Sequence, residues 1–281
     1  MAMTDSHGRF VWYELMTTDL KAAAAFYAKV VGWGMRDASM PGMSYTLLTV
    51  GETSAGGLMT LPEDAKRMGA QPRWLGYVAV DDVDAAARRI SQLGGAVHVP
   101  PSDIPDIGRF SVVADPQAAT FALIKWLKPG QAQPDELDKP GWVGWHELLA
   151  ANGEQAFPFY AELFGWRKAE AEIEPESTYR PFSVGTQTIG GMFTKPAMVP
   201  MPFWLYYFNI GDIGAAVEDV KALGGKILEG PVDVPGGSRV ARCEDPQGAM
   251  FALIEKRKDN AVGYFARGAS TPGAGDRRWS W

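Results

Sequence analysis

The chain has 281 residues, of which 46% are hydrophobic and 21% charged, values typical of an ordinary soluble globular protein. Its formal net charge of −6 and its lack of a long basic run argue against nucleic acid as a partner. No apolar segment is long enough to span a bilayer, so no membrane partner is expected. The single cysteine, Cys243, excludes an intrachain disulfide and is interpreted as a small buried hydrophobic residue. The polar start of the chain lacks the apolar core of a signal peptide, which predicts a cytoplasmic location.

An internal repeat organises the sequence. Residues 12–33 recur without a gap as residues 145–166, and nine of the twenty-two positions are identical. Unrelated segments would share far fewer, so the chain consists of two copies of one domain. Within the first copy, Trp12 and Glu14 are two residues apart in a predicted strand and therefore share one face of it. The second copy repeats both residues.

The elements of the first copy follow a strand–helix–strand order that occurs twice. Strands are expected at 10–16, 45–50, 56–61, 74–80, 96–99, 109–114 and 120–126, and helices at about 20–31 and 83–93. Asp19 and Asp82 are the expected helix N-caps, and Gly32 is well placed to end the first helix. A polar segment bounded by prolines, residues 62–72, is expected to be a connector. Each domain is therefore interpreted as two βαβββ units.

The second copy begins after a linker that contains three prolines and almost no apolar residues. Asn152 is its expected helix N-cap, and its later segments match the first copy at an offset of 130. After residue 256 the chain becomes polar and rich in glycine and alanine. The predicted boundaries are domain 1 at 8–127, a linker at 128–140, domain 2 at 141–256 and a C-terminal tail at 257–281.

Three motifs carry a family resemblance. They are Asp-Leu…Phe-Tyr…Gly-Trp after one strand, Val-Asp-Asp-Val-Asp-Ala-Ala…Leu-Gly-Gly after another, and Asp-Pro-Gln followed by Phe-Ala-Leu-Ile. Over residues 10–125 and 142–255 the chain resembles the vicinal-oxygen-chelate superfamily of glyoxalases, bleomycin-resistance proteins and extradiol dioxygenases. More narrowly, it is similar to tandem-domain actinobacterial members, among them a culture-filtrate antigen and proteins called hydroxylases. The resemblance implies an α+β fold of two tandem glyoxalase-like domains. Each would consist of paired βαβββ modules that form an open eight-stranded barrel around a ligand.

Metal-dependent members of that superfamily place His, Gln or Glu at four inward positions. The matching positions here are Trp12, Leu75, Ala122 and Met59 in the first copy and Trp145, Leu205, Ala252 and Phe193 in the second. None is an ordinary donor for a hard divalent metal, so neither a metal site nor any other cofactor is expected. This argues against glyoxalase, dioxygenase and epimerase chemistry, which uses the metal as Lewis acid or oxygen activator. A shift in register would bring Glu14 or Glu147 to a ligand position, but each copy would still lack three partners.

The three histidines do not change this expectation. His7 lies in the loose start of the chain, and the second copy has Leu228 in the place of His98. His146 alternates out of phase with its neighbours in the strand, so it should point away from the barrel interior. Each is interpreted as a structural or surface histidine rather than a ligand.

Strand alternation predicts which side chains line each barrel. The lining residues are Trp12, Glu14, Leu75, Tyr77, Ala122 and Ile124 in domain 1, and Trp145, Glu147, Leu205, Tyr207, Ala252 and Ile254 in domain 2. Residues of the other parity, Leu15, Val78, Phe121 and Leu123, should face the helices as core. Each interior would thus be apolar and aromatic with one carboxylate, which is the usual composition of a small-molecule site.

Burying an unpaired carboxylate costs about 3–5 kcal/mol, so the glutamates need an explanation. The first is a structural hydrogen bond to a tyrosine, arginine or serine inside the barrel, with Arg109 and Arg239 as candidate partners. The second is recognition of a cationic or hydrogen-bonding ligand beside aromatic faces. The third is a general acid or base with a raised pKa.

The leading functional hypothesis is metal-independent binding of a small, aromatic or cationic organic molecule by a monomeric or dimeric protein. One alternative is an enzyme of lyase, isomerase, dioxygenase or hydroxylase type that uses Glu14 and Glu147 as catalytic residues or a non-standard metal site. The other is a scaffold without catalytic activity whose interiors are filled by its own side chains.

Overall fold

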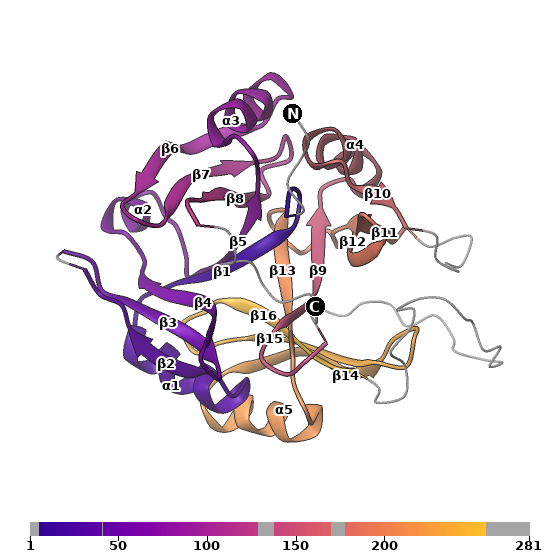
Figure 1. Ribbon diagram of the computed structural model, residues 1–281. Helices are drawn as coiled ribbons and strands as arrows, with labels where there is room; N and C mark the ends of the chain where they lie inside the picture. The colour runs from indigo at the N-terminus through magenta and orange to yellow at the C-terminus, as the bar shows by residue number, and fades with distance from the viewer. Residues whose placement is uncertain (1–5, 41, 129–137, 170–177, 257–281) are drawn as a thin grey trace.

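The computed structural model describes residues 6–40, 42–128, 138–169 and 178–256 and shows two similar domains in close contact (Figure 1). The predicted C-terminal tail and most of the predicted linker lie outside the described residues. No helix in the described ranges has the length and apolar character needed to cross a membrane.

Domain 1 contains one mixed sheet of eight strands. Its elements are β1 (Phe10–Thr17), α1 (Leu20–Val30), β2 (Gly34–Asp37), β3 (Tyr45–Val50), β4 (Thr53–Thr60), α2 (Glu63–Arg67), β5 (Arg73–Ala79), α3 (Val83–Gln92), β6 (Ala96–Ile104), β7 (Gly108–Ala114) and β8 (Thr120–Trp126). The strand order is β2-β3-β4-β1-β5-β8-β7-β6, so the sheet does not close and β2 and β6 are its edges. This confirms the predicted α+β fold with an open eight-stranded arrangement.

Domain 2 repeats this topology. Its elements are β9 (Val143–Ala150), α4 (Gly153–Phe164), β10 (Arg167–Lys168), β11 (Arg180–Val184), β12 (Gln187–Thr194), β13 (Phe203–Asn209), α5 (Ile213–Ala222), β14 (Lys226–Asp233), β15 (Arg239–Glu244) and β16 (Met250–Glu255). The strand order is β10-β11-β12-β9-β13-β16-β15-β14, which matches domain 1 strand for strand.

The helix boundaries follow from the predicted caps. The side chains of Asp19, Asp82 and Asn152 each accept a hydrogen bond from the backbone N–H three residues ahead. Gly32 directly follows the C-cap of α1 and has a φ of +86°, a conformation that favours glycine. Two elements were not predicted. The short edge strand β2 is mostly exposed, and the segment 62–72, expected to be only a connector, contains α2.

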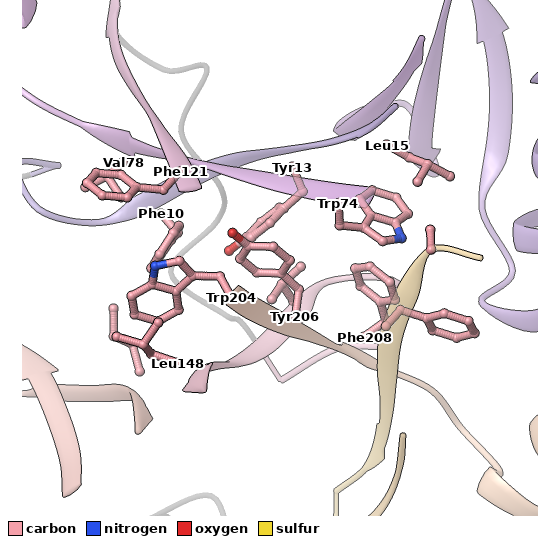
Figure 2. Packing of buried hydrophobic residues seen from close by; sticks show 14 of the residues in the cluster. Phe10, Tyr13, Leu15, Trp74, Val78, Phe121, Leu148, Trp204, Tyr206 and Phe208 are labelled. Carbon is pink, nitrogen blue, oxygen red and sulfur yellow. The ribbon is translucent and has the colours of Figure 1, made fainter. Parts of the chain in front are cut away.

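The helix-facing sides of the two sheets share one hydrophobic core. Figure 2 shows Phe10, Tyr13 and Trp74 of domain 1 close to Trp204, Tyr206 and Phe208 of domain 2. The residues of outward parity, Leu15, Val78, Phe121 and Leu123, belong to this core as predicted. Cys243 is also fully buried in it, as expected of a small hydrophobic residue, and burial raises the pKa of its thiol to about 12.

Helices of one domain lie beside helices of the other at this interface. α1 lies beside α5, and α3 lies beside α4 (Figure 1). Tyr27 of α1 donates a hydrogen bond to Asp245 over 3.0 Å, and its repeat partner Tyr160 donates to Asp115 over 2.9 Å. The indoles of the predicted core residues Trp33 and Trp166 also bond across the interface, to the carbonyl oxygens of Gly141 and Gly8, each at 2.7 Å. The repeat thus produces a pseudo-symmetric interface.

Candidate functional site

The inner face of each sheet brings together the predicted lining residues. In domain 1, β1 and β5 pair in a register that places Trp12 opposite Tyr77 and Glu14 opposite Leu75, and β8 places Ala122 beside Tyr77. Domain 2 has the same register, with Trp145 opposite Tyr207, Glu147 opposite Leu205, and Ala252 beside Tyr207. The apolar members, with Ile124 and Ile254, form two clusters separate from the shared core. Their roles in ligand binding remain predictions.

Glu14 lies at the centre of the domain 1 face and is only 8% exposed. Its Oε1 accepts a hydrogen bond from the Tyr77 hydroxyl and its Oε2 accepts one from Tyr45, each at 2.9 Å. Trp12 donates from Nε1 to the Tyr45 oxygen over 3.2 Å. Burial raises the pKa of Glu14 above its usual value, although the two tyrosine hydrogen bonds lower it in part. Among the described residues, the contacts of this carboxylate are with tyrosines, and no lysine or arginine pairs with it.

Tyr45 is a residue of this site that was not predicted from the sequence. Its ring lies over Gly57 of β4 so closely that a Cβ there would fall 2.0 Å from the hydroxyl oxygen. Domain 2 repeats the arrangement with Tyr179 over Gly191. A glycine inside a strand often marks the close approach of another group, so these glycines were a usable signal in the sequence.

Glu147 occupies the equivalent position in domain 2 but has a cationic partner. Arg242 donates from Nη2 to Glu147 Oε2 over 2.7 Å, and the Tyr207 hydroxyl donates to the same oxygen over 2.7 Å. Arg242 also pairs with Glu229, and its guanidinium carbon lies 5.9 Å from the centre of the Phe193 ring. Glu147 and Arg242 are 4% and 3% exposed. Burial alone would lower the pKa of Arg242, but the neighbouring carboxylates more than offset this, so the guanidinium stays charged.

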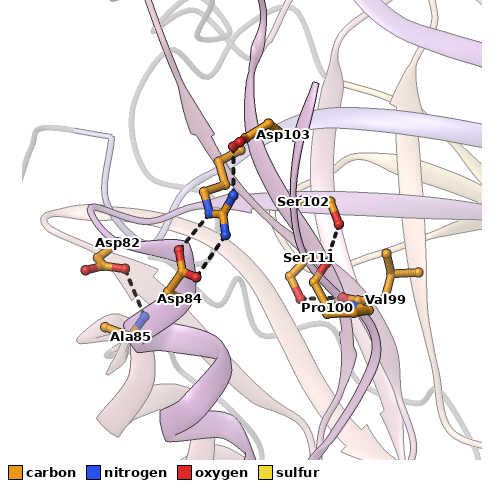
Figure 3. A network of polar contacts seen from close by, with 9 residues as sticks. Asp82, Asp84, Ala85, Val99, Pro100, Ser102, Asp103 and Ser111 are labelled. Atoms are coloured by element: carbon orange, nitrogen blue, oxygen red, sulfur yellow. Dashed lines mark hydrogen bonds and ion pairs between the residues drawn. The ribbon is translucent and has the colours of Figure 1, made fainter. Parts of the chain in front are cut away.

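The structural explanation for the glutamates named tyrosine, arginine or serine as partners, and the tyrosine hydrogen bonds are present, but the choice of Arg109 and Arg239 as candidate partners was wrong. Arg109 bonds instead to Asp84 through Nε at 2.7 Å and to Asp103 through Nη1 at 2.8 Å. Figure 3 draws these contacts of Asp84 and Asp103 as dashed lines. Arg239 lies 3.9 Å from Glu255. Strand parity explains the error, because residues 239 and 242 differ by an odd number and point to opposite faces.

A second polar group on the domain 1 face is the indole of Trp126 at the end of β8. Its ring packs against the inner cluster and meets the ring of Trp12 edge to face, with centroids 6.0 Å apart. Its Nε1 is buried and has no hydrogen-bond partner among the described residues. An unpaired buried donor is uncommon in native proteins, and here the described residues supply no acceptor for it.

His146 points away from the inner face, as predicted. Its Nδ1 lies 2.7 Å from the Ile189 carbonyl oxygen, which can only accept, so Nδ1 carries the proton. Its Nε2 then accepts from the hydroxyl of Tyr13, its repeat partner, over 2.5 Å. Burial lowers the pKa of His146 to about 4. Of the other two histidines, His7 is 3.3 Å from Asp81 and His98 is exposed.

The donors on the inner faces do not fit a divalent metal ion. Within the described ranges, no three His, Cys, Asp or Glu side chains are arranged to hold one. Six of the eight positions that match the superfamily's metal ligands belong to the inner apolar clusters: Leu75, Ala122, Trp145, Leu205, Phe193 and Ala252. Of the other two, Trp12 packs against the domain 1 cluster and Met59 is half-buried. One carboxylate with phenol and indole donors is suited instead to hydrogen bonding with an organic molecule.

Comparison with known proteins agrees with this architecture. The Mycobacterium tuberculosis protein named "Putative glyoxylase CFP32" is 33% identical over 246 residues, which cover 87% of this chain and 93% of that protein. The anthracycline biosynthesis protein DnrV of Streptomyces peucetius is 30% identical over 277 residues, covering 89% and 94%.

Two solved structures share the fold at low sequence identity. The Mn(II)-bound glyoxalase from Novosphingobium aromaticivorans has a TM-score of 0.61 at 16% identity and covers 91% of this chain and 83% of its own. The 2,3-dioxygenase LapB from Pseudomonas sp. KL28 has a TM-score of 0.61 at 12% identity and covers 90% and 93%. The family model for the Glyoxalase/Bleomycin resistance protein/Dioxygenase superfamily matches residues 9–123 and 142–253. Because these matches span most of both domains, the chain belongs to the Glyoxalase/Bleomycin resistance protein/Dioxygenase superfamily.

Proposed function

We propose that the inner face of domain 1 binds a small organic molecule that carries an aromatic ring and donates a hydrogen bond to Glu14. The observation that carries this proposal is the surroundings of Glu14, whose buried carboxylate is held by two neutral tyrosine hydroxyls. Burying a charge without a counterion is costly. A protein is therefore expected to keep such an unbalanced buried carboxylate where the group recognises or transforms a ligand.

The other groups on this face suit such a ligand. Trp12 and Tyr77 offer aromatic surface, and the N–H of Trp126 supplies a donor for an oxygen on the same molecule. The tyrosines remain protonated donors, because burial and then the nearby Glu14 raise the pKa of both Tyr45 and Tyr77. Apolar walls with a few placed polar groups are typical of small-molecule sites.

The relatives support a small-molecule role, since one is named as a glyoxylase and another as a protein of anthracycline biosynthesis. In this proposal binding needs no metal ion or other cofactor, and neither nucleic acid nor membrane is a partner. The protein would act in the cytoplasm as a monomer or dimer.

A thermal-shift screen of aromatic metabolites and drugs, followed by titration calorimetry, tests the proposal because a ligand stabilises the folded state by mass action. We expect hits whose affinity falls by about tenfold or more in Glu14→Gln, which keeps the shape but removes the charge. Glu63→Gln, at an exposed position of α2, is the matched control and should leave binding unchanged. Hits that bind Glu14→Gln as well as the natural protein would refute the role of Glu14.

The raised pKa of Glu14 favours a second candidate, an enzyme in which this carboxyl acts as general acid or base without a metal. Compounds that bind would then also be converted. In that case Glu14→Gln would retain part of the binding and lose turnover by about 100-fold or more. Mass spectrometry of each hit after incubation with natural and variant protein separates this candidate from binding alone.

A further inference from the structure

Each domain has a buried glutamate at the same position of the repeat, and the two glutamates differ in whether an arginine neutralises them. At the offset of 130, Arg242 corresponds to Val112 and Glu229 corresponds to Val99. Each pair consists of cross-strand neighbours, on β14 and β15 in domain 2 and on β6 and β7 in domain 1. The register is therefore preserved, and only the side chains have changed from an ion pair to two valines.

The guanidinium of Arg242 fills a defined place in domain 2. It lies between the carboxylates of Glu147 and Glu229, and its Nε donates to the hydroxyl of Tyr207 over 3.1 Å. The ring of Phe193 lies below it at cation–π distance. A side chain of the chain itself thus acts as the organic cation that the Glu147 carboxylate binds.

Domain 1 has the same carboxylate and tyrosine without that cation. Glu14 and Tyr77 repeat the positions of Glu147 and Tyr207. Val112, which stands in the place of Arg242, has a short apolar side chain that cannot hydrogen-bond to them. Val112 is half-buried and packs against the edge of the inner cluster. Among the described residues, Glu14 has hydrogen bonds from Tyr45 and Tyr77 and no arginine or lysine in contact, so it lacks the counterion that Arg242 gives to Glu147.

We propose that domain 1 binds an aromatic amidinium, guanidinium or ammonium ion, with its charged group on Glu14 where Arg242 lies on Glu147. This inference rests on the proposed function and specifies the ligand class of the same site. It also assigns one site to each chain, because domain 2 is already occupied by its own arginine.

Benzamidinium and benzylammonium are suitable probes, with benzamide and benzyl alcohol as neutral controls of nearly the same shape. Titration calorimetry of the full-length natural protein should give one binding event per chain. Each cation should bind at least about tenfold more tightly than its neutral control, because a charge-assisted hydrogen bond to a carboxylate is markedly stronger than a neutral one.

Exchange of the two residues between domains tests the position of the charge. Val112→Arg should supply an internal cation to Glu14 and weaken benzamidinium binding by tenfold or more, about the loss expected in Glu14→Gln. Gln71→Arg adds the same charge at an exposed position and should leave binding unchanged.

Glu229→Val with Arg242→Val gives domain 2 the residues of domain 1 and should raise the stoichiometry from one to two. Val99→Glu with Val112→Arg makes the opposite exchange, giving domain 1 the residues of domain 2, and should abolish binding. This second variant keeps the test valid if the domain 2 variant does not fold.

Equal affinity for benzamidinium and benzamide, or unchanged binding in Val112→Arg, would overturn the inference. If neutral aromatic compounds bind in a Glu14-dependent manner and the cations do not, the inference fails and the proposed function stands. If no aromatic compound of either kind binds the natural protein, both fail.

Discussion

At the scale of single residues, surroundings rather than identity decide what a glutamate does in this fold. Glu14 and Glu147 descend from the same position of the repeat and both accept a hydrogen bond from a tyrosine on the adjacent strand. Glu147 also has Arg242, so its charge is balanced within the protein. Glu14 has only phenol donors among its described contacts, and burial raises its pKa. The first carboxylate is thus balanced within the protein, and we propose that the second serves interaction with a ligand.

The buried His146 should make the protein sensitive to mild acid. Its pKa is about 4 in the folded state against about 6.5 in the unfolded chain, so the unfolded state binds the extra proton between these values. Stability contributed by neutral His146 is complete above pH 6.5 and is lost as the pH falls toward 4. Between pH 7 and 5 the loss is about 2 kcal/mol.

Denaturant unfolding at pH 7 and pH 5 can isolate this contribution. The natural protein should lose about 2 kcal/mol more of its free energy of unfolding than His146→Gln, whose side chain does not titrate. The comparison is needed because the carboxyls of Glu14, Asp115 and Asp245, whose pKa values are raised by burial, change stability in the opposite direction. An equal loss in both proteins would contradict the assignment.

At the scale of elements, a glycine in β4 determines where a tyrosine of β3 can lie. Gly57→Ala would place a Cβ against the Tyr45 ring and force it off Glu14. We expect a loss of about 1–3 kcal/mol in stability and a further rise in the pKa of Glu14. Gly211→Ala is the control, because Gly211 has open space around its Cβ position. A crystal structure of Gly57→Ala with Tyr45 unmoved would contradict this explanation.

Much of each domain could be predicted because strands and caps leave local signals. Alternation placed Trp12 and Glu14 on the inner face, and Asp19 capped its helix as expected. Alternation also placed Tyr77 and Tyr207 on the faces of the glutamates that they contact, but the partners Tyr45 and Arg242 could not be found in this way. Tyr45 reaches Glu14 across one intervening strand, β4, and Arg242 reaches Glu147 across two, β13 and β16. Such contacts depend on the order of the strands in the sheet, which no local sequence pattern gives. The short edge strand β2 lacks the burial that produces a clear apolar pattern.

At the scale of the whole molecule, the repeat stabilises the protein because each domain covers the core of the other. A single core includes residues of both sheets, and matched tyrosine–aspartate hydrogen bonds cross between them. The inner faces, which lie on the opposite side of each sheet, are consequently not needed for association. Divergence between Val112 and Arg242 could therefore proceed without disturbing the interface.

This arrangement predicts cooperative unfolding of the two domains. Tyr160→Phe removes the donor to Asp115 and the acceptor for Trp204, which should lower the free energy of unfolding by about 2–3 kcal/mol. Tyr27→Phe breaks the corresponding pair of bonds, to Asp245 and from Trp74, and should have a similar effect. Both variants should unfold in one transition, and the slope of the free energy of unfolding against denaturant concentration should not change. Two separate transitions in the natural protein would show that the domains unfold independently.

The most direct test of the different roles of the two glutamates is the same substitution in both, measured as the free energy of unfolding at pH 7. Glu14→Gln should stabilise the protein by about 1 kcal/mol, because it removes a buried charge that no cation balances and retains hydrogen bonding to the tyrosines. Glu147→Gln should destabilise it by about 2–3 kcal/mol, because Arg242 would keep only Glu229 as counterion. Opposite signs of the two changes in the free energy of unfolding would support an unbalanced buried carboxylate in domain 1 and one neutralised by Arg242 in domain 2. Equal effects in the two domains would contradict the account.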